Sequence, residues 1–346
     1  MHWYPVELHT HTCHSDGDFT VKELVRTAKR DGYRALALTD HNTASGVEEF
    51  CREAKKQGIL PIRGLEWTTY HGHMTVLEEE GYTDWRGAGP EDIDNAIRAI
   101  HKNGGVVGIA HPFALGDPVN TGYRWEFQIK DWTQVDCLEV WSRNWAPRRI
   151  QTERAFAMWD DLLRKGFHIT AVTGRDWHRD DRLPCCYTWV GMFGELTREG
   201  LLDALRQGRV CLTAGPFFTM KLFQGHREFF PGDTLSVSGR FCPGTGGPEA
   251  GTSEAGTPGT GAGEEKVRAE VLLDRDVLPG TWEKKQVVPE EICLIVNGTV
   301  RDVVPVRGKV KLDIQPEKGW ARAELYGRYY ETEHCRIAVT NPVYID

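Results

Sequence analysis

Apolar and polar residues alternate in two different ways along the chain. From residue 5 to about 210, short apolar runs rich in β-branched residues alternate with segments in which apolar residues recur every three to four positions. This pattern is typical of βα units that build a parallel sheet. The predicted strands are 5–9, 34–39, 59–64, 73–77, 106–110, 135–140 and 168–174, and the predicted helices are 20–31, 43–57, 91–103, 148–165 and 197–207.

Turn and cap residues support two of these elements and add a hairpin. Thr20 with Glu23 three positions later forms a capping box at the start of the first helix, and Gly58 ends the second helix. Near the C-terminus, Asn297 and Gly298 stand between two apolar runs, which predicts a β-hairpin.

From about residue 213 the helical pattern disappears and short strands separated by turn residues replace it. We therefore expect an α/β domain over 1–212 and a small β-sandwich-like C-terminal domain over 213–346. Within the latter, residues 243–264 are almost entirely Gly, Pro, Thr, Ala, Ser and Glu. Such a segment cannot bury enough apolar area to offset its ordering entropy, so it predicts a flexible insert.

Composition narrows the possible partners. The 346 residues carry a net charge of −8, and the pI is near 5.9, which disfavours extended nucleic-acid binding through a broad basic face. There is no apolar run of bilayer-spanning length and no secretory signal pattern, so a soluble cytoplasmic protein is expected. The nine cysteines are scattered without CxxC spacing, which argues against a thiolate zinc site.

Side chains that commonly bind metals follow most of the predicted strands. Catalytic groups gather at the carboxyl ends of strands in barrels of βα units, so these residues are expected to converge at one mouth. Any one of these side chains alone is a weak signal, so the prediction depends on the placement of all of them together. The candidates are His9, His11, His41, Glu66, His73, His111, Asp176 and His178.

This mixture of residue types indicates a polynuclear metal site. Neutral imidazoles suit zinc, manganese or iron, while a carboxylate can bridge two cations and neutralise their charge. Glu66 and Asp176 are the candidate bridging ligands.

The ordered strings HTHTCHSDG, TDHN, GLEWTTYHGH, AHP and GRDWH, over about residues 7–180, resemble the motif set of the PHP (polymerase and histidinol phosphatase) superfamily. More narrowly, the TTYHGH and GRDWH strings and the β-rich C-terminal half are similar to the carbaryl-hydrolase-like CehA/McbA branch. The resemblance implies a distorted TIM-like (β/α)7 barrel with two or three divalent metal ions, Mn, Zn or Fe.

Transferred position by position, the resemblance implies three ligand groups. The first is His9, His11, Glu66 and Asp176; the second is Glu66, His73 and His111; the third is Asp16, His41 and His178. His14 is an alternative to Asp16. Asp176, His178 and Arg175 are the predicted catalytic residues. Arg175 replaces a small residue of many relatives and is, with Arg143 and Arg179, a candidate clamp for phosphate oxygens; Arg143 and Arg179 could instead form surface ion pairs.

The implied activity is that of a phosphoesterase, in which a hydroxide shared by two metals attacks a phosphate ester of a small molecule or nucleotide. One alternative is a carbamate or carboxylic ester hydrolase that uses the same metal site. Another is a non-catalytic, metal-stabilised binding module. A free-standing nuclease also stays open.

Overall fold

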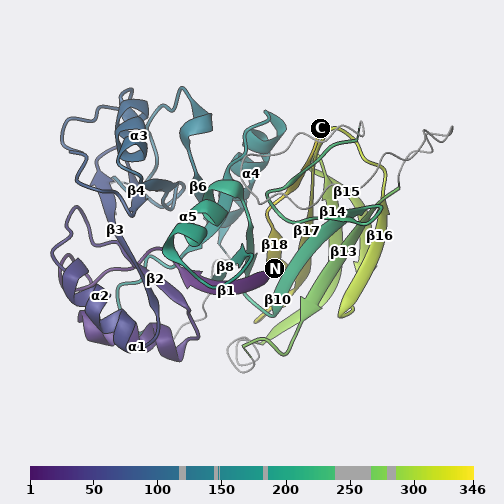
Figure 1. Cartoon of the computed structure of the whole chain (residues 1–346), viewed down its shortest axis with the longest axis horizontal. Helices are drawn as coiled ribbons and strands as arrows, with labels where there is room; N and C mark the ends of the chain where they lie inside the picture. Colours follow the sequence, from purple (N-terminus) through teal and green to yellow (C-terminus); the bar gives the residue numbers. More distant parts are fainter. Residues whose placement is uncertain (117–121, 144–146, 148, 182–185, 238–265, 279–285) are drawn as a thin grey trace, which may run out of the picture.

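The computed structural model describes residues 1–116, 122–143, 147, 149–181, 186–237, 266–278 and 286–346. Strands and helices alternate through the first part of the chain (Figure 1). The strands are β1 (His2–Glu7), β2 (Ala35–Leu38), β3 (Leu60–Thr69), β4 (Gly72–Leu77), β5 (Val106–Ile109), β6 (Cys137–Ser142), β7 (Thr170–Gly174) and β8 (Tyr187–Met192). The helices are α1 (Val21–Arg30), α2 (Val47–Lys56), α3 (Ile93–Lys102), α4 (Ile150–Arg164) and α5 (Arg198–Gln207).

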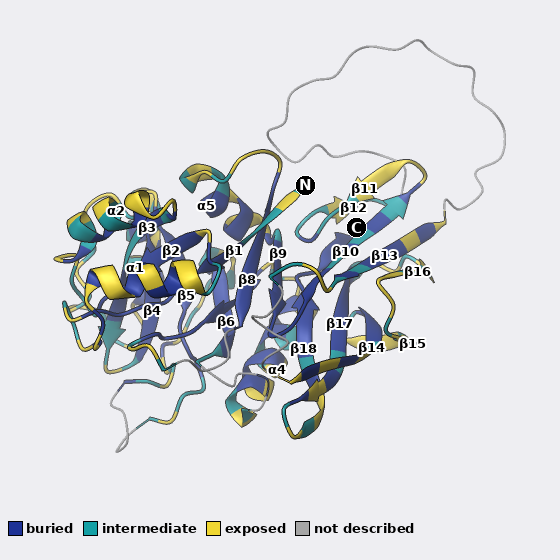
Figure 2. Cartoon of the chain, turned by 90° about the horizontal axis from the view of Figure 1, so that it is seen from below, coloured by how far each residue is buried: buried dark blue, intermediate teal, exposed yellow. Residues whose placement is uncertain are grey.

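Local sequence explains how α1 begins and where its apolar side lies. Thr20 and Glu23 form the predicted capping box, in which each side chain bonds the backbone N–H of the other. The buried residues of α1, among them Leu24 and Val25, pack toward the sheet. Figure 2 shows strands of the first part, such as β6 and β8, buried along most of their length, whereas the outer faces of α1 and α2 are exposed.

The strands follow the order β8-β1-β2-β3-β4-β5-β6-β7. The runs β1-β2-β3 and β5-β6-β7 are parallel, whereas β4 is antiparallel to both neighbours. Beyond their strand ends, β1 and β7 meet in one parallel bridge between Thr10 and Trp177. The predicted α/β class is confirmed. A regular TIM-like barrel is not, because β4 reverses the strand direction and the bridge between β1 and β7 is a single residue pair.

Strands dominate after α5. They are β9 (Val210–Thr213), β10 (Phe217–Gln224), β11 (Arg227–Phe229), β12 (Thr234–Leu235), β13 (Val267–Asp274), β14 (Val287–Val296), β15 (Thr299–Pro305), β16 (Lys309–Ile314), β17 (Gly319–Tyr329), β18 (Thr332–Thr340) and β19 (Val343–Ile345). Asn297 and Gly298 have φ of 52° and 78° and connect β14 to β15, so the predicted hairpin is confirmed.

The two parts of the chain share one sheet. β9 covers the predicted boundary at residue 212 and pairs with β8 on one side and β18 on the other. A second sheet, in the order β11-β10-β13-β16, lies beside it (Figure 1). The division into two domains therefore stays a prediction, and the predicted insert at 243–264 lies outside the described residues.

Polar contacts also join the two parts. The buried side chain of Asn341 bonds both the N–H and the carbonyl of Ala171 in β7. On α4, Asp160 accepts from Arg322 of β17, and Glu153 accepts from Arg336 of β18. Glu324 is buried between the two arginines. Among the helices in the described ranges, none is long and apolar enough to cross a membrane.

Candidate metal centre

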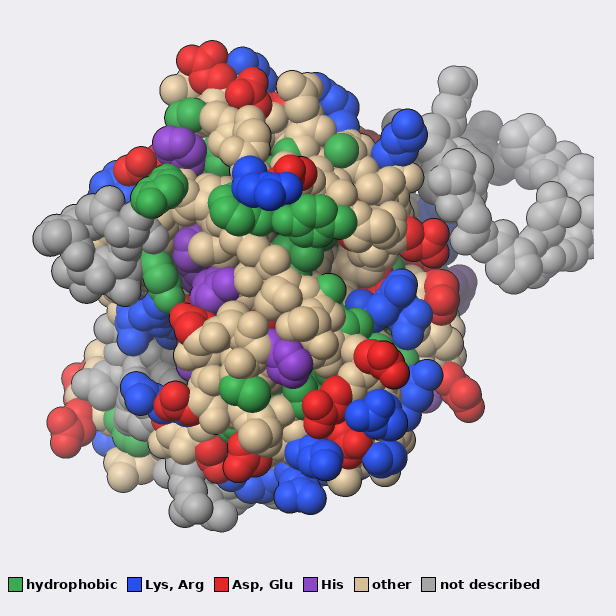
Figure 3. Space-filling view, turned by 90° about the vertical axis from the view of Figure 1, so that its left-hand side faces the viewer, with side chains coloured by type: hydrophobic (Ala, Val, Ile, Leu, Met, Phe, Trp, Pro, Cys, Tyr) green, Lys and Arg blue, Asp and Glu red, His purple; other side chains and the backbone are tan. Residues whose placement is uncertain are grey.

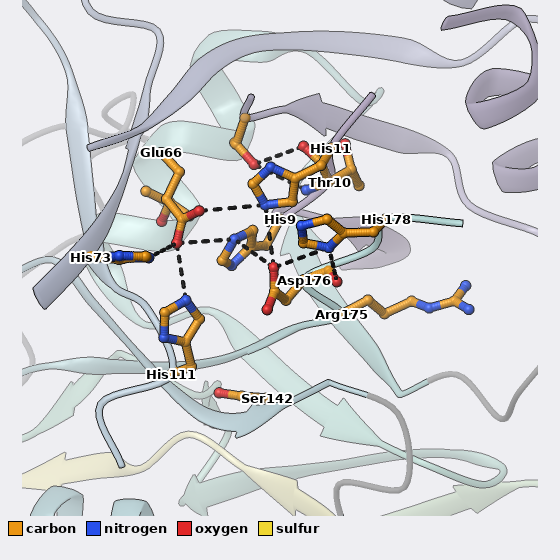
Figure 4. Close-up of polar contacts among 12 residues, drawn as sticks. His9, Thr10, His11, Glu66, His73, His111, Ser142, Arg175, Asp176 and His178 are labelled. Carbon is orange, nitrogen blue, oxygen red and sulfur yellow. Dashed lines mark hydrogen bonds and ion pairs between the residues drawn. The ribbon is translucent and has the colours of Figure 1, made fainter. Parts of the chain in front are cut away.

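The predicted ligands come from successive strands or the loops that follow them. Figure 4 shows His9, His11, Glu66, His73, His111, Asp176 and His178 close together. Asp16 and His41 contact this group through His178 and Glu66. His9 and His11 directly follow β1, and their alternate positions in an extended segment place both imidazoles on one side. Glu66 lies within β3, and His73, near the beginning of β4, lies opposite Thr68 across the hairpin. Because β4 is antiparallel, its first residues reach the same mouth as the carboxyl ends of β1, β2, β5 and β7.

A fully buried group forms the centre of this cluster. The ligand atoms of His9, His11, Glu66 and Asp176 all lie within 4.8 Å of one another. His9 Nε2 is 3.3 Å from Glu66 Oε1, and His11 Nε2 is 3.3 Å from Asp176 Oδ1 and 3.4 Å from Glu66 Oε2. These four residues are those predicted for the first metal.

A second group extends from the buried centre to the surface. It contains His11, Asp16, His41 and His178. Asp16 Oδ1 lies 3.2 Å from His178 Nε2 and 3.4 Å from His41 Nε2, and the Asp16 side chain is 57% exposed. His14 points elsewhere and bonds Ser45. The geometry therefore favours Asp16 over His14. Figure 3 shows that the face at the left-hand side of Figure 1 carries His side chains among acidic, basic and apolar ones.

The third group differs from the predicted one. It contains His41, Glu66 and His73, whereas His73 and His111 were expected to share Glu66. His111 is nevertheless close, because its Nε2 lies 3.0 Å from Glu66 Oε1, and His73 Nδ1 lies 3.1 Å from the same oxygen. Glu66 thus contacts imidazoles from four strands, as expected for a carboxylate shared between cations.

The cluster contains buried polar atoms that make no hydrogen bond with any of the described residues. A buried polar atom without a partner is costly, and a bound cation would satisfy all of these at once. They are His9 Nε2, both ring nitrogens of His11, Glu66 Oε2, His73 Nε2 and Asp176 Oδ1. The residues therefore fit divalent metal ions.

The electrostatics of the site agree with this interpretation. Burial raises the pKa of Glu66, but the surrounding imidazoles outweigh it and hold that pKa well below its usual value. Burial also raises the pKa of Asp176, but the hydrogen bond with His11 and the charge of His9 outweigh it and hold that pKa well below its usual value. Burial lowers the pKa of His11 and His73. At His9, His41 and His178 the nearby carboxylates outweigh burial and raise the pKa. Metal binding requires ionised carboxylates and neutral imidazoles, so a cation would displace protons from these three histidines.

Glu139 of β6, which the sequence analysis did not select, supports the cluster from behind. Its Oε1 lies 2.7 Å from His9 Nδ1, and its Oε2 accepts from the N–H of His111 at 2.8 Å and the hydroxyl of Ser142 at 3.2 Å. Gly174 leaves room for it, since a Cβ there would lie 1.9 Å from Glu139 Oε1. The available signal was a carboxylate, Glu139, between apolar residues of the predicted strand 135–140, which also contains Asp136.

The predicted role of Arg175 as a phosphate clamp is not supported. Its guanidinium points away from the cluster (Figure 4), lies 3.3 Å from Asp31 and 3.4 Å from Asp181, and stacks 3.6 Å over the ring of Trp177. Arg179 is largely exposed and lies 3.8 Å from Asp18. Arg143 is at the site instead, with Nε 2.9 Å from Asp176 Oδ2.

Three residues at the mouth have a backbone conformation that side chains rarely adopt. The φ angles are 27° for His111, 66° for Arg143 and 49° for Asp176. Strain of this kind gathers at functional sites, where the surrounding structure holds it in place. The hydrogen bond from the N–H of His111 to Glu139 is one such restraint.

The fold and the cluster define a class of protein: α/β chains that gather histidines and carboxylates from several strands into a candidate polynuclear metal centre. Residues 7–115 match the family model of the PHP domain. This confirms the predicted resemblance to the PHP superfamily. The narrower resemblance to the carbaryl-hydrolase-like branch stays a prediction.

Individual proteins are also similar to part of this chain. The chain is 45% identical over 98 residues to an error-prone DNA polymerase of Symbiobacterium thermophilum, a match that covers 28% of this chain and 8% of the polymerase. It is 43% identical over 63 residues to a 5'-3' exoribonuclease of Haemophilus influenzae, covering 18% of this chain and 23% of that enzyme. The chain thus spans only a small part of these relatives.

One solved structure matches nearly the whole chain. It is a two-domain protein from Bacteroides vulgatus that contains a predicted PHP-like metal-dependent phosphoesterase. The TM-score is 0.51 at 16% identity, and the match covers 99% of this chain and 95% of the other. At this identity the likeness shows a shared fold.

Proposed function

We propose that this protein is a metal-dependent phosphoesterase that acts on a small phosphorylated molecule or nucleotide. The observation that carries the proposal is the set of buried, unsatisfied ligand atoms on His9, His11, Glu66 and Asp176, with the Arg143 guanidinium beside them. The PHP domain match supports it.

In this proposal His9, His11, Glu66 and Asp176 hold one divalent cation in the buried centre, and Asp16, His41 and His178 hold another at the exposed end. His73 and His111 complete the coordination on the other side of Glu66. Two or three Mn, Zn or Fe ions would act as Lewis acids and supply an activated water near neutral pH.

The chain's own residues have separate tasks. Glu66 provides negative charge between the groups, and its burial removes competing water. His178 lies 2.8 Å through Nδ1 from the carbonyl of Asp176, so Nδ1 donates there and Nε2 is left to face Asp16 and the solvent. Arg143 presents a guanidinium whose planar fork matches two oxygens of a phosphate. Asp176 fixes that guanidinium from the cluster side.

The first experiment combines elemental analysis of the purified protein with a hydrolysis screen in added Mn²⁺. The substrates are p-nitrophenyl phosphate, bis-p-nitrophenyl phosphate and 1-naphthyl carbamate. We expect two or three metals per chain and release of p-nitrophenol from at least one phosphate ester. Asp176→Asn should remove most of that activity. His226→Gln, which alters an exposed turn, is the matched control.

The other outcomes separate the alternatives. Cleavage of the carbamate alone would contradict the proposal and favour an ester hydrolase acting on carbon. Turnover of neither class by a metal-loaded protein would favour a binding module. Cleavage only of the diester would move the proposal toward nucleases, as in the exoribonuclease relative.

A further inference from the structure

Tyr123 lies beside the candidate metal centre, and no role has been assigned to it above. Its ring stacks on the ring of His111, with the ring centroids 4.8 Å apart and the two planes 23° from parallel. It also packs against the ring of His73, with a centroid distance of 5.0 Å. The guanidinium carbon of Arg143 lies 4.8 Å from the centre of the same ring. Tyr123 therefore contacts two candidate metal ligands and the arginine that is paired with a third.

The backbone around Tyr123 holds the ring in this place. The Tyr123 carbonyl lies 3.2 Å from His111 Nδ1 and accepts a hydrogen bond from it, which leaves the other ring nitrogen of His111 for a cation. The next residue pairs with Phe113 in an antiparallel bridge. Gly122 lies against the end of β3, since a Cβ there would be 2.0 Å from the Thr69 carbonyl oxygen. The ring is thus fixed on both sides in sequence, as a group that contacts a substrate must be.

The Tyr123 hydroxyl is available to a ligand. It forms no hydrogen bond within the part of the chain that the structure describes. It is also not one of the buried polar atoms without a partner, so solvent reaches it. A phenol is protonated at neutral pH and can donate one hydrogen bond. A substrate oxygen can therefore replace the water that this donor otherwise bonds.

The position of the ring favours a phosphate oxygen as the acceptor. In the proposed function a metal ion is held by His73 and His111, and Arg143 binds the phosphate. Since the Tyr123 ring contacts all three side chains, a phosphate between that metal ion and Arg143 would lie beside Tyr123. Packing on the two imidazoles requires only the ring, so it does not explain the hydroxyl.

We propose that Tyr123 is a catalytic residue whose hydroxyl donates a hydrogen bond to a nonbridging oxygen of the phosphate to be cleaved. This inference rests on the proposed phosphoesterase function and adds a substrate contact to it. The proton stays on the phenol oxygen throughout, so Tyr123 acts neither as an acid nor as a nucleophile. The hydrogen bond helps the metal ions and Arg143 to neutralise the phosphate and to hold it in one orientation.

The test is Tyr123→Phe, which removes the hydroxyl and retains the ring. Hydrolysis is measured with whichever of p-nitrophenyl phosphate and bis-p-nitrophenyl phosphate the protein cleaves. Binding of inorganic phosphate to the metal-loaded protein is measured by calorimetry, which does not require turnover. We expect kcat/KM to fall about 10- to 100-fold and phosphate to bind about tenfold or more weakly, because a hydrogen bond to a charged group is lost.

The metal content of the Tyr123→Phe protein should be unchanged, because its ring still packs on His73 and His111. Elemental analysis measures this content, and circular dichroism checks the fold. The matched control is Tyr82→Phe, which alters a 50% exposed tyrosine after β4, at the end of that strand away from the mouth. It should change kcat/KM and phosphate affinity by less than about twofold.

The outcomes distinguish this inference from the proposed function. Hydrolysis of a phosphate ester with unchanged kcat/KM and phosphate affinity in Tyr123→Phe would overturn the contact and leave the phosphoesterase intact. A loss of metal that accounts for the loss of activity would also overturn it, because Tyr123 would then act only on the ligands. Phosphate binding that depends on the hydroxyl, in a metal-loaded protein that hydrolyses no phosphate ester, would support the contact and overturn the proposed function.

Discussion

Glu139 controls which nitrogen of His9 is available to a metal. A carboxylate can only accept, so the 2.7 Å contact requires His9 Nδ1 to donate. In the neutral imidazole that a metal binds, Nε2 is then the nitrogen without a proton. That Nε2 is the atom 3.3 Å from Glu66 Oε1 and 3.6 Å from Asp176 Oδ1. We therefore expect Glu139→Gln to weaken metal binding although it changes the side chain by one atom.

The amide cannot satisfy both neighbours. If its oxygen accepts from the N–H of His111, its NH₂ faces His9 Nδ1, which must then accept, and the proton moves to Nε2. If its oxygen accepts from His9 instead, the NH₂ opposes the N–H of His111, and a buried donor loses its acceptor at a cost of about 1–3 kcal/mol. Loss of such supporting contacts lowers metal affinity about 10–100-fold, which corresponds to about 1.4–2.7 kcal/mol.

The assay is a competition titration of Mn²⁺ and Zn²⁺ between the metal-free protein and a fluorescent chelator. Circular dichroism establishes that the variant is folded. Ser142→Ala is the control, because it removes the 3.2 Å bond to the same carboxylate but water can replace a half-exposed hydroxyl; we expect a loss of under about fivefold. Unchanged Mn²⁺ and Zn²⁺ affinities in a folded Glu139→Gln protein would refute the reasoning.

Three further predictions concern other parts of the molecule. Asp176→Ala should remove at least one metal and abolish turnover, and full occupancy by elemental analysis with an unchanged rate would contradict the site. Arg175→Met should destabilise the fold by about 2–4 kcal/mol in denaturant titrations, since it breaks two ion pairs of a buried guanidinium; an unchanged midpoint would be the contrary result. Burial raises the pKa of Glu324, but Arg322 and Arg336 outweigh it and lower that pKa from 4.5 to about 2. A lowered folded-state pKa stabilises the protein above the unfolded value, so about 3 kcal/mol should be lost as the pH falls from about 4.5 to 2. A Glu324→Gln protein should be less stable at neutral pH and should lack this contribution, and an equal acid response in both proteins would count against it.

The parts of the fold that sequence predicted are those that local chemistry determines. The capping box at Thr20 and the turn at Asn297 depend on a few adjacent residues, and both are confirmed. The PHP resemblance depends on ordered motifs and is confirmed by the match over residues 7–115.

The direction of β4 was the main error in the fold, and a signal for it was present. The predicted strand ended at residue 64, whereas β3 continues to Thr69 and only two residues separate it from Gly72. A connection this short permits only an antiparallel partner, because parallel strands require a crossover of a dozen or more residues. The apolar pattern alone does not contain this information, since it indicates which residues are buried and not the direction of the strand.

The exchange of roles between Arg175 and Arg143 has a similar cause. Arg175 adjoins Asp176 in sequence, but both follow the end of β7, and the φ of 49° at Asp176 turns the backbone there. Asp176 lies in the centre, whereas Arg175 contacts Asp31 and Trp177. Arg143 is distant in sequence and reaches Asp176 because β6 and β7 are neighbours in the sheet. Sequence proximity to a ligand is therefore weak evidence for a substrate contact. A residue that follows the neighbouring strand and lies beside the ligand in the sheet is the better candidate, as Arg143 is for Asp176.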